Sequence, residues 1–436
     1  MGDIPGGAIR PGADPRPVVA DLDYVLGLTN ALPPDGRPSR RVVELGRWIA
    51  QQGLDAIRID QLIETTLARI VAAGIPVSRF QLSGSTLHPE FLAFAQTWWR
   101  DRDDVEAEFY TGETPGQGNF PQSPLAVLLA ADTLILRFDP RLDALKARFP
   151  LFETYAAEGA TDYISEKFAF GMGEPSTFDT MVGVALSWMT DDEAGFSDQD
   201  ITDLRIIAPW LAMAVRIRGE METLDTLLSV FLGADAGQRV ARGQIRRGDV
   251  VSLRAAILYA DLRSFTAVST QLETAQLVDL LNDYLGHIVA GIEEEGGQVL
   301  KFIGDGILAI FPVADGGDEA ATVQGALRAA NKAMASVERV NGERGNMPTC
   351  PGIDVALHIG EVLYGNVGAT HRLDFTVIGS SVNAISRLEG LCQPLSAPII
   401  MSDEFARCGG KTISVRSLGC HKLRGLAGEM EVFAPA

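Results

Sequence analysis

Two aspartates stand where an isolated negative charge is costly. The stretches AAILYADLRSFT (255–266) and QVLKFIGDGILAIF (298–311) each place one aspartate, Asp261 or Asp305, at the end of a strongly apolar run. Such runs are typical of buried strands, and a carboxylate at the end of a buried strand needs something cationic beside it. If the two aspartates meet, they predict a shared site for hard divalent cations, which prefer oxygen ligands.

A second pair of polar residues, Asn383 and Arg387, lies in the stretch VIGSSVNAISRLE. Residues four apart share one face of a helix. From that face Arg387 can reach phosphate oxygens, and the Asn383 amide can bind a sugar or a water. An ordinary solvated helix surface is the alternative. The glycine-containing turn IGSS directly upstream favours the ligand-binding interpretation, because it opens the helix towards a ligand.

The elements expected to position these residues follow a βαββαβ order. A strand over RAAILYAD is followed by the helix TAQLVDLLNDYLGHIVAGIEEEG and by two strands joined at Asp305-Gly306. Asp-Gly between apolar strands is typical of a hairpin, although it can also be a turn with no other role. A second helix is expected from about Asp318 to Asn341. We therefore predict an α+β domain of the ferredoxin-like kind, with Asp261 ending its first strand.

The N-terminal half predicts a separate α+β domain. Residues 1–40 are rich in Pro, Gly and Asp and are expected to form a flexible tail. Helices and strands should follow, the strands including SRFQLSG, ADTLILRF and MVGVALSWMT. Ser197 and Asp200 can cap a long terminal helix, in which Pro209 predicts a kink. The order of strand, GFSDQD turn and terminal helix resembles the end of a GAF-like sensory domain, which would occupy 41–219. A domain without a known ligand is the alternative.

The segment 220–248 is expected to connect the two halves. Its helical stripe of leucines and phenylalanine is followed by glycines and arginines. We predict a helical linker that either transmits a signal or simply packs on a neighbour. The second domain would then occupy 249–436.

Composition limits the class of protein. The formal net charge is −20, which disfavours general binding of nucleic acids. No apolar stretch approaches the length of a membrane span, and the N-terminus lacks the features of a signal peptide. The four cysteines have no CxxC pairing, so reduced thiols in a cytoplasmic protein are expected. These features predict a cytoplasmic protein with no nucleic-acid or membrane partner.

The motifs AILYADLRSFT, KFIGDGILAIF and DFTVIGSSVNAISRLE, in this order and spacing, resemble the catalytic domain of class III nucleotide cyclases. The resemblance covers 250–436 almost continuously. It implies two metal ions per active site, Mg²⁺ or Mn²⁺, held by Asp261 and Asp305. It also implies that Asn383 orients the ribose and that Arg387 stabilises charge on the phosphates during the reaction.

The same resemblance implies three further nucleotide-binding residues. Lys301 matches the lysine that reads the adenine ring, and Thr376 matches the second base-reading residue of the Thr-type adenylate cyclases. Lys301 can donate to adenine N1, and the Thr376 hydroxyl can accept from the adenine amino group. Guanine presents the reverse pattern, so the pair favours ATP, although a hydroxyl can also donate. Arg424 aligns with a basic residue that holds the terminal phosphates, and Lys422 is an alternative for that role.

The implied function is an adenylate cyclase, a phosphorus–oxygen lyase. The ribose 3′-OH of ATP would attack the α-phosphate and give 3′,5′-cyclic AMP and pyrophosphate. The family places its sites at a dimer interface, so a homodimer is expected in which one chain supplies Asp261 and Asp305 and its partner supplies the other site residues. The N-terminal domain would regulate activity in response to a small-molecule or protein signal that the sequence does not name. The alternatives are a guanylate or dual-specificity cyclase and a non-catalytic nucleotide-binding regulator.

Overall fold

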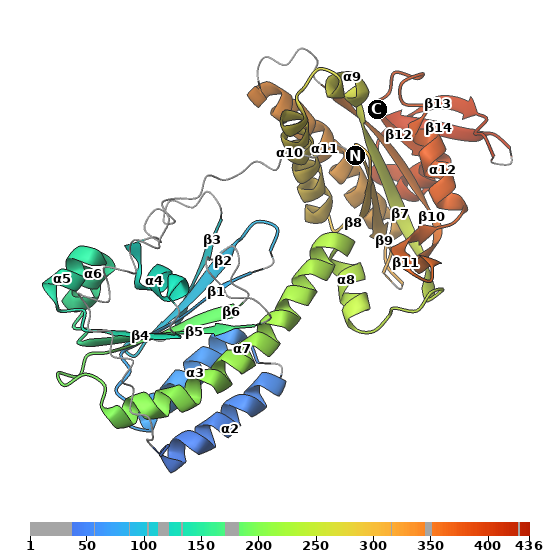
Figure 1. Ribbon diagram of the computed structural model, residues 1–436. Helices are drawn as coiled ribbons and strands as arrows, with labels where there is room; N and C mark the ends of the chain where they lie inside the picture. The colour runs from blue at the N-terminus through green and yellow to red at the C-terminus, as the bar shows by residue number, and fades with distance from the viewer. Residues whose placement is uncertain are drawn as a thin grey trace. The chain divides into compact units, whose positions relative to one another are not determined.

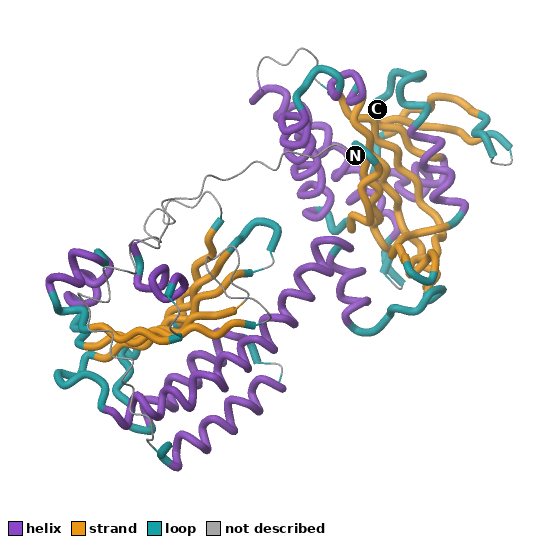
Figure 2. Tube along the Cα trace, viewed as in Figure 1, coloured by secondary structure: helices purple, strands orange, loops and turns teal. Residues whose placement is uncertain are grey.

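The computed structural model (Figures 1 and 2) describes residues 37–55, 57–86, 88–102, 104–111, 122–131, 134–170, 183–314, 316–344, 351–425 and 428–436. The tail expected at residues 1–40 lies almost entirely outside these residues. The chain divides into two compact units, Met1–Thr226 and Leu227–Ala436, and each is described by itself. Within the described ranges, every helix is too short or too polar to span a bilayer.

The N-terminal unit is built on a six-stranded antiparallel sheet in the order β3-β2-β1-β6-β5-β4. Its strands are β1 (Arg79–Ser85), β2 (Ala93–Trp99), β3 (Val105–Tyr110), β4 (Ile135–Phe138), β5 (Asp162–Ala169) and β6 (Gly183–Thr190). The strands expected over SRFQLSG, ADTLILRF and MVGVALSWMT correspond to β1, β4 and β6. These segments form strands because their apolar residues recur at the spacing of a pleated sheet.

Helices pack on both faces of this sheet (Figure 1). Along one face run α2 (Arg40–Leu54), α3 (Ile59–Ala72) and α7 (Asp198–Leu232), with Phe80 and Trp188 in the core between helices and sheet. The other face carries α4 (Pro124–Ala130), α5 (Asp143–Arg148) and α6 (Leu151–Ala157), which enclose an aromatic cluster that includes Phe138 and Tyr163. Both faces are therefore buried over part of their area, and the unit has its own core.

The long helix α7 begins at the predicted cap. The Ser197 backbone N–H donates to Asp200 Oδ2 (2.9 Å), and the Asp200 N–H donates to Ser197 Oγ (3.2 Å). These reciprocal bonds satisfy donors that the first helical turn leaves free. Pro209 lies inside the helix, and the kink expected there remains a prediction. The helix continues to Leu232, so it runs from the first unit into the second.

The C-terminal unit contains an eight-stranded sheet in the order β13-β14-β12-β10-β7-β9-β8, with β11 pairing onto β10. The strands are β7 (Val250–Arg263), β8 (Gln298–Ile303), β9 (Gly306–Pro312), β10 (Gly352–Ala369), β11 (Arg372–Ile378), β12 (Ile399–Ser402), β13 (Val415–His421) and β14 (Met430–Pro435). The helices are α8 (Ala234–Ala241), α9 (Phe265–Ser269), α10 (Thr274–Glu294), α11 (Glu319–Arg344), α12 (Ser380–Glu389) and α13 (Asp403–Gly409).

The predicted βαββαβ order is present in this unit. Along the chain, β7, α10, β8, β9, α11 and β10 follow one another, and the four strands lie in the order β8-β9-β7-β10. Helices α10 and α11 pack on one face, where Leu258 and Tyr284 are buried. Helix α12 packs on the opposite face, where Ile257 and Ile385 are buried. Consecutive β7 residues thus serve opposite cores, which explains why the run is apolar throughout.

One expectation about β7 needs correction. Asp261 is not the last residue of the strand, because β7 continues to Arg263. The pairing with β10 extends this far, since Leu262 is buried under the helical layer and Arg263 bonds to Asp354 on β10. Asp261 therefore lies inside the ladder, two residues before its end.

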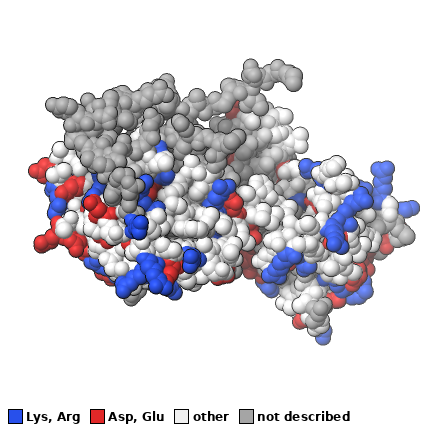
Figure 3. Space-filling model, turned by 60° about the horizontal axis from the view of Figure 1, so that its bottom comes forward, with Lys and Arg blue, Asp and Glu red and all other residues white. Residues whose placement is uncertain are grey.

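The surface mixes charges of both signs. Figure 3 shows basic and acidic side chains intermingled on the face in view, rather than gathered by sign.

Candidate active site

Asp261 and Asp305 meet at the edge of the β7–β9 pair. Asp305 occupies the turn between β8 and β9, as predicted for a hairpin tip, and Gly306 begins β9. A Cβ atom added to Gly306 would lie 2.9 Å from Asp261 Oδ1 and 3.1 Å from the Ala260 carbonyl oxygen. The Asp261 carboxylate thus rests against the residue that follows Asp305. The structure therefore brings the two predicted metal-binding residues to one place.

Repulsion between carboxylates is concentrated at Asp261. Burial, then the charge of Asp305, then that of Asp354 raise the pKa of Asp261 to about 6. The pKa of Glu389, at the end of α12, is raised by burial and by the same three aspartates. Both effects have one cause, an excess of negative charge in a partly desolvated place. A divalent cation would remove that cause.

The carboxylate of Asp354 already has a cationic partner. Asp354 lies directly opposite Asp261 in the β7–β10 ladder and is 1% exposed. Arg263 Nε donates to Asp354 Oδ2 (3.2 Å), and Arg263 Nη2 donates to Oδ1. Burying a charge this completely demands such a partner. Asp354 is therefore a structural neighbour of the site, and Asp261 and Asp305 are the carboxylates left for an ion.

The donor set fits a hard cation only in part. Among the described residues, no group of three or more His, Cys, Asp and Glu side chains is arranged to hold a metal ion. Asp261 and Asp305 supply the anionic oxygen ligands that Mg²⁺ and Mn²⁺ prefer, and Mg²⁺ commonly binds through one or two carboxylates together with substrate phosphates and waters. The residues thus fit an ion that arrives with its substrate.

Lys301 and Thr376 lie on neighbouring elements of the same unit. Lys301 Nζ donates to Asp374 Oδ2 (2.6 Å), which joins β8 to β11. Thr376, two residues further along β11, is 6% exposed, and its Oγ1 has no hydrogen-bond partner in the part of the chain that the structure describes. A buried hydroxyl without a partner is unusual and costly. The orphaned oxygen is the feature expected of a residue whose partner is a ligand.

Asn383 and Arg387 share the exposed side of α12, as predicted. The helix starts after Gly379, whose φ of +146° is available to few other residues, and Ser381 Oγ fixes this turn by donating to the Glu361 carbonyl (3.0 Å). Both Asn383 and Arg387 are exposed. Among the described residues no carboxylate pairs with Arg387. The guanidinium is therefore available to an external anion.

Arg424 and Lys422 both lie between β13 and β14 and are both exposed. Neither forms an ion pair with a described residue. The choice between them as the phosphate-binding residue stays open. The structure brings together Asp261 with Asp305, Lys301 with the strand of Thr376, and Asn383 with Arg387.

Sequence reasoning missed four residues around the site. Asp354, Asp374, Glu389 and Tyr259 all lie beside predicted site residues. Asp354 offered a signal, since it is a single acid inside the apolar run GIDVALHIG. The contact of Asp374 with Lys301 depends on how β11 folds back towards β8, and nothing in the local sequence indicates it.

Comparisons with known proteins address this unit. Residues 252–434 match the family model described as the adenylate and guanylate cyclase catalytic domain. An adenylate cyclase of Anabaena cylindrica is 34% identical over 205 residues, which cover 45% of this chain and 39% of that protein. A terminal-differentiation-specific adenylate cyclase of Dictyostelium discoideum is 30% identical over 199 residues, which cover 44% of this chain and 9% of that protein. The solved structure of the adenylyl cyclase CyaB from P. aeruginosa is 25% identical, covers 43% of this chain and 95% of that chain, and has a TM-score of 0.40.

Most of the C-terminal unit is therefore similar to the catalytic domain of adenylate and guanylate cyclases. The match lies wholly within the second unit. The chain spans less than half the length of either curated relative, 39% of one and 9% of the other.

Proposed function

We propose that this protein is an adenylate cyclase that converts ATP to 3′,5′-cyclic AMP and pyrophosphate. The observation that carries the proposal is the contact of the Asp261 carboxylate with Gly306, beside Asp305, within a domain that matches the cyclase family. The two carboxylates would hold the divalent cations, two per site as the resemblance implies. When bound, Mg²⁺ or Mn²⁺ would neutralise phosphate charge and lower the pKa of the 3′-OH.

The reaction is an intramolecular displacement at the α-phosphorus. A bond forms between the ribose 3′-oxygen and this phosphorus, the bond to the bridging oxygen breaks, pyrophosphate leaves, and the hydroxyl proton is released. Asn383 would hold the ribose so that its 3′-oxygen lies in line with the leaving group. Arg387, exposed and without a carboxylate partner among the described residues, would stabilise charge on the phosphates. Catalysis would thus consist mainly of positioning and charge neutralisation.

Lys301 and Thr376 would read the adenine. The Lys301 ammonium would donate to N1, and the Thr376 hydroxyl would accept from the 6-amino group. The unpartnered Oγ1 of Thr376 supports this role, because an adenine amino group would satisfy it. Without a nucleotide, the Lys301 ammonium donates a hydrogen bond to Asp374 instead. Arg424 or Lys422 would bind the terminal phosphates.

A guanylate or dual-specificity cyclase is the second candidate. Its support is that the Thr376 hydroxyl can donate to the guanine carbonyl as well as accept. The test is a purified-protein assay with ATP or GTP as sole substrate in Mn²⁺ or Mg²⁺. Cyclic AMP as the dominant product supports the proposal, and cyclic GMP formed at an equal or greater rate contradicts ATP selectivity. Absence of any cyclic product would favour a non-catalytic nucleotide-binding regulator.

The proposed active form is a homodimer with two equivalent sites. One chain would give Asp261 and Asp305, and its partner would give Lys301, Thr376, Asn383, Arg387 and the phosphate-binding residue at 424 or 422. The support is that this chain carries both halves of the set. A monomer would then be inactive.

The N-terminal unit would be a GAF-like sensory domain that regulates the rate in a cytoplasmic protein. The six-stranded antiparallel sheet and the terminal helix α7, which leads into the second unit, support this proposal. The test compares the cyclase rate of the full chain with that of a chain lacking residues 1–220. An unchanged rate under all conditions would argue against an input role.

A further inference from the structure

A polar cavity of about 360 Å³ lies in the N-terminal unit, remote in sequence from every residue of the cyclase domain. It is lined by the start of β1, the connection from β2 to β3, the segment after α6 and the end of β6. Four separate segments thus converge on it. Its volume suits a small metabolite rather than a nucleotide or a peptide.

A buried guanidinium lines this cavity. Arg79 is 9% exposed, and no described carboxylate pairs with it. Its Nη2 donates to Gln81 Oε1 (2.8 Å), and its guanidinium lies over the rings of Tyr155 (4.8 Å) and Trp99 (5.5 Å). These contacts position the group but do not neutralise it. A buried charge without a counter-ion is strongly unfavourable, so an anion is the missing partner.

A second group in the cavity also lacks a partner. The indole Nε1 of Trp99 is buried and has no hydrogen-bond acceptor among the residues that the structure describes. Indole N–H groups are donors only, and they find an acceptor in most buried positions. An anion beside Arg79 would offer one. The missing counter-ion of Arg79 and the missing acceptor of Trp99 are thus two separate observations, and both indicate an anionic ligand.

The other charges of the cavity favour an anion with a single charge. Arg100 pairs with Asp191, and Arg102 Nη1 lies 3.6 Å from Glu106 Oε2. Two exposed acids also line the cavity, Asp101 and Glu158, and neither pairs with a described cation. Their repulsion disfavours a doubly charged phosphate more than a carboxylate. A carboxylate also matches the guanidinium fork with two parallel hydrogen bonds.

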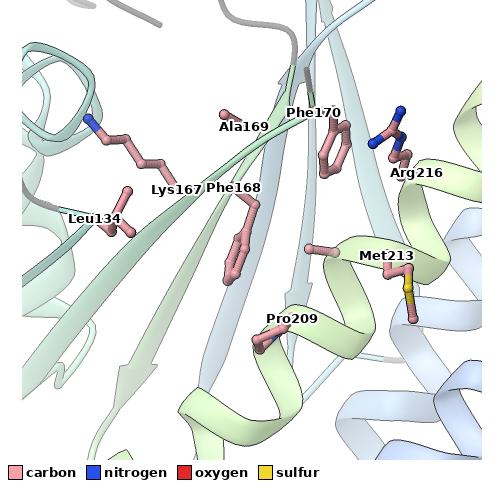
Figure 4. Close-up of a pocket in the computed structure, with 9 residues that line it drawn as sticks. Leu134, Lys167, Phe168, Ala169, Phe170, Pro209, Met213 and Arg216 are labelled. Atoms are coloured by element: carbon pink, nitrogen blue, oxygen red, sulfur yellow. The ribbon is translucent and has the colours of Figure 1, made fainter. Parts of the chain in front are cut away.

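A second cavity of this unit gives a useful contrast. It has a volume of about 420 Å³ and lies between β5 and α7, where Figure 4 shows Phe168, Phe170, Pro209 and Met213 around it. Its lining is mainly apolar. Arg216 Nε donates to Glu220 (2.8 Å), and Lys167 Nζ donates to the Ala131 carbonyl (2.7 Å). Its cations are thus engaged, and it lacks the unpaired buried charge of the Arg79 cavity.

We propose that the Arg79 cavity binds a small monocarboxylate, which pairs with the Arg79 guanidinium and accepts a hydrogen bond from Trp99 Nε1. The ligand carries one negative charge. The proposal does not depend on cyclase activity, since it rests on the N-terminal unit alone.

The test measures acetate binding to the full-length protein by saturation-transfer difference NMR on the acetate methyl signal. Ionic strength is held constant with NaCl, so a general salt effect is excluded. We expect a saturable signal. Arg79→Gln should weaken binding at least about tenfold, because it removes the charge and the fork. Trp99→Phe, which keeps an aromatic ring and loses only the N–H, should weaken it by about fivefold.

Arg69→Gln is the matched control, because Arg69 also lies over a tryptophan, Trp48 (4.2 Å), but lines neither cavity. It should bind acetate as the unaltered chain does. If the Arg79→Gln variant does not fold, acetate binding to the Trp99→Phe variant decides the test. The proposal is overturned if acetate gives no saturable signal, if the folded Arg79 variant or the Trp99 variant binds as tightly as the unaltered chain, or if inorganic phosphate displaces acetate at concentrations below the acetate Kd.

Discussion

The Asp261 carboxylate is partly buried, and repulsion from the carboxylates of Asp305 and Asp354 adds to the cost of its burial. Its pKa rises to about 6, above the value of about 3.9 expected in an unfolded chain. The folded state therefore favours the protonated form. Below a pH of about 3.9 the group is neutral in both the folded and the unfolded state, so it does not change the free energy of unfolding. As the pH rises through about 6, the charged form destabilises the folded protein. Such a cost is expected where a cation normally binds.

Asp261→Asn should therefore stabilise the cation-free protein at about pH 8 and leave it unchanged near pH 4. The gain at the higher pH should be on the order of 1 kcal/mol, after allowance for solvent screening of a half-exposed group. Urea unfolding in the presence of a chelator measures it. Asp279→Asn, at an exposed position on α10, is the control and should show no such pH-dependent gain. Equal stability of the Asp261→Asn variant and the unaltered protein at both pH values would contradict the electrostatic account.

Thr376→Val should separate recognition from stability. Valine keeps the shape of threonine and removes a hydroxyl that has no partner among the described residues, so the free energy of unfolding should stay the same or rise slightly. The kcat/KM for ATP should fall about tenfold, the worth of one hydrogen bond in a desolvated site. Thr376→Ser, which keeps the hydroxyl, should retain most of the rate. An unaffected valine variant would remove Thr376 from the set of base-reading residues.

The predictability of the site differs from residue to residue. The sequence indicates Asp261 and Asp305 as candidates because each interrupts an apolar run, and it indicates Asn383 and Arg387 because helical spacing is local. Asp354 lies beside the site because the β7–β10 register places it opposite Asp261. Asp374 lies there because β11 folds back towards β8, where Asp374 accepts from Lys301. Register and folding-back depend on tertiary packing, which one sequence without structural context does not specify.

At the scale of elements, the β8–β9 hairpin determines the position of the carboxylates. Gly306 lets the Asp261 side chain approach the turn, since a Cβ at this position would lie 2.9 Å from Oδ1. The Ala260 carbonyl oxygen and the Tyr259 hydroxyl each lie 3.1 Å from the position of this Cβ. They leave no room for the Cβ to move away from Asp261. The absence of a side chain at position 306 thus leaves the space that the Asp261 carboxylate occupies.

Gly306→Ala should displace the Asp261 carboxylate and lower kcat by at least about tenfold, because small displacements at a reacting centre are costly. Gly286→Ala is the control: this glycine lies on the exposed side of α10, and a Cβ added there would have nothing within 4 Å. There alanine should stabilise the helix by about 1 kcal/mol and leave the rate unchanged. Steady-state kinetics and urea unfolding of both variants test the claim. A fully active alanine variant at 306 would mean that the contact is unimportant.

Element types were largely predictable, and one connection was not. Hydrophobic periodicity identified the strands and helices of the βαββαβ core, because burial on one or both faces determines the spacing of apolar residues. The sequence did not indicate that α7 continues unbroken from Asp198 to Leu232 across the division between the units. Helix propensity is a local property, whereas the boundary between the two units depends on which side chains pack together. The sequence therefore indicates the helix but not the boundary inside it.

At the scale of the whole molecule, the chain combines a unit that matches the cyclase catalytic domain with a separate unit that has its own core and a cavity lined by Arg79, which has no carboxylate partner among the described residues. The proposed sites are shared between two copies of the chain, each giving the carboxylates to one site and the base-reading and phosphate-binding residues to the other. Symmetry then makes the two sites equivalent. This arrangement makes a quantitative prediction about mixed dimers.

The most direct measurement is the activity of a mixture of two inactive variants, Asp261→Ala and Arg387→Ala. Each should be inactive alone, because both of its sites lack one essential group. After unfolding and refolding together in equal amounts, half of the dimers should contain one of each chain and have one intact site, so about a quarter of the normal cyclic AMP production should return. A mixture as inactive as the separate variants, or an active single variant, would contradict the account of a composite two-carboxylate site.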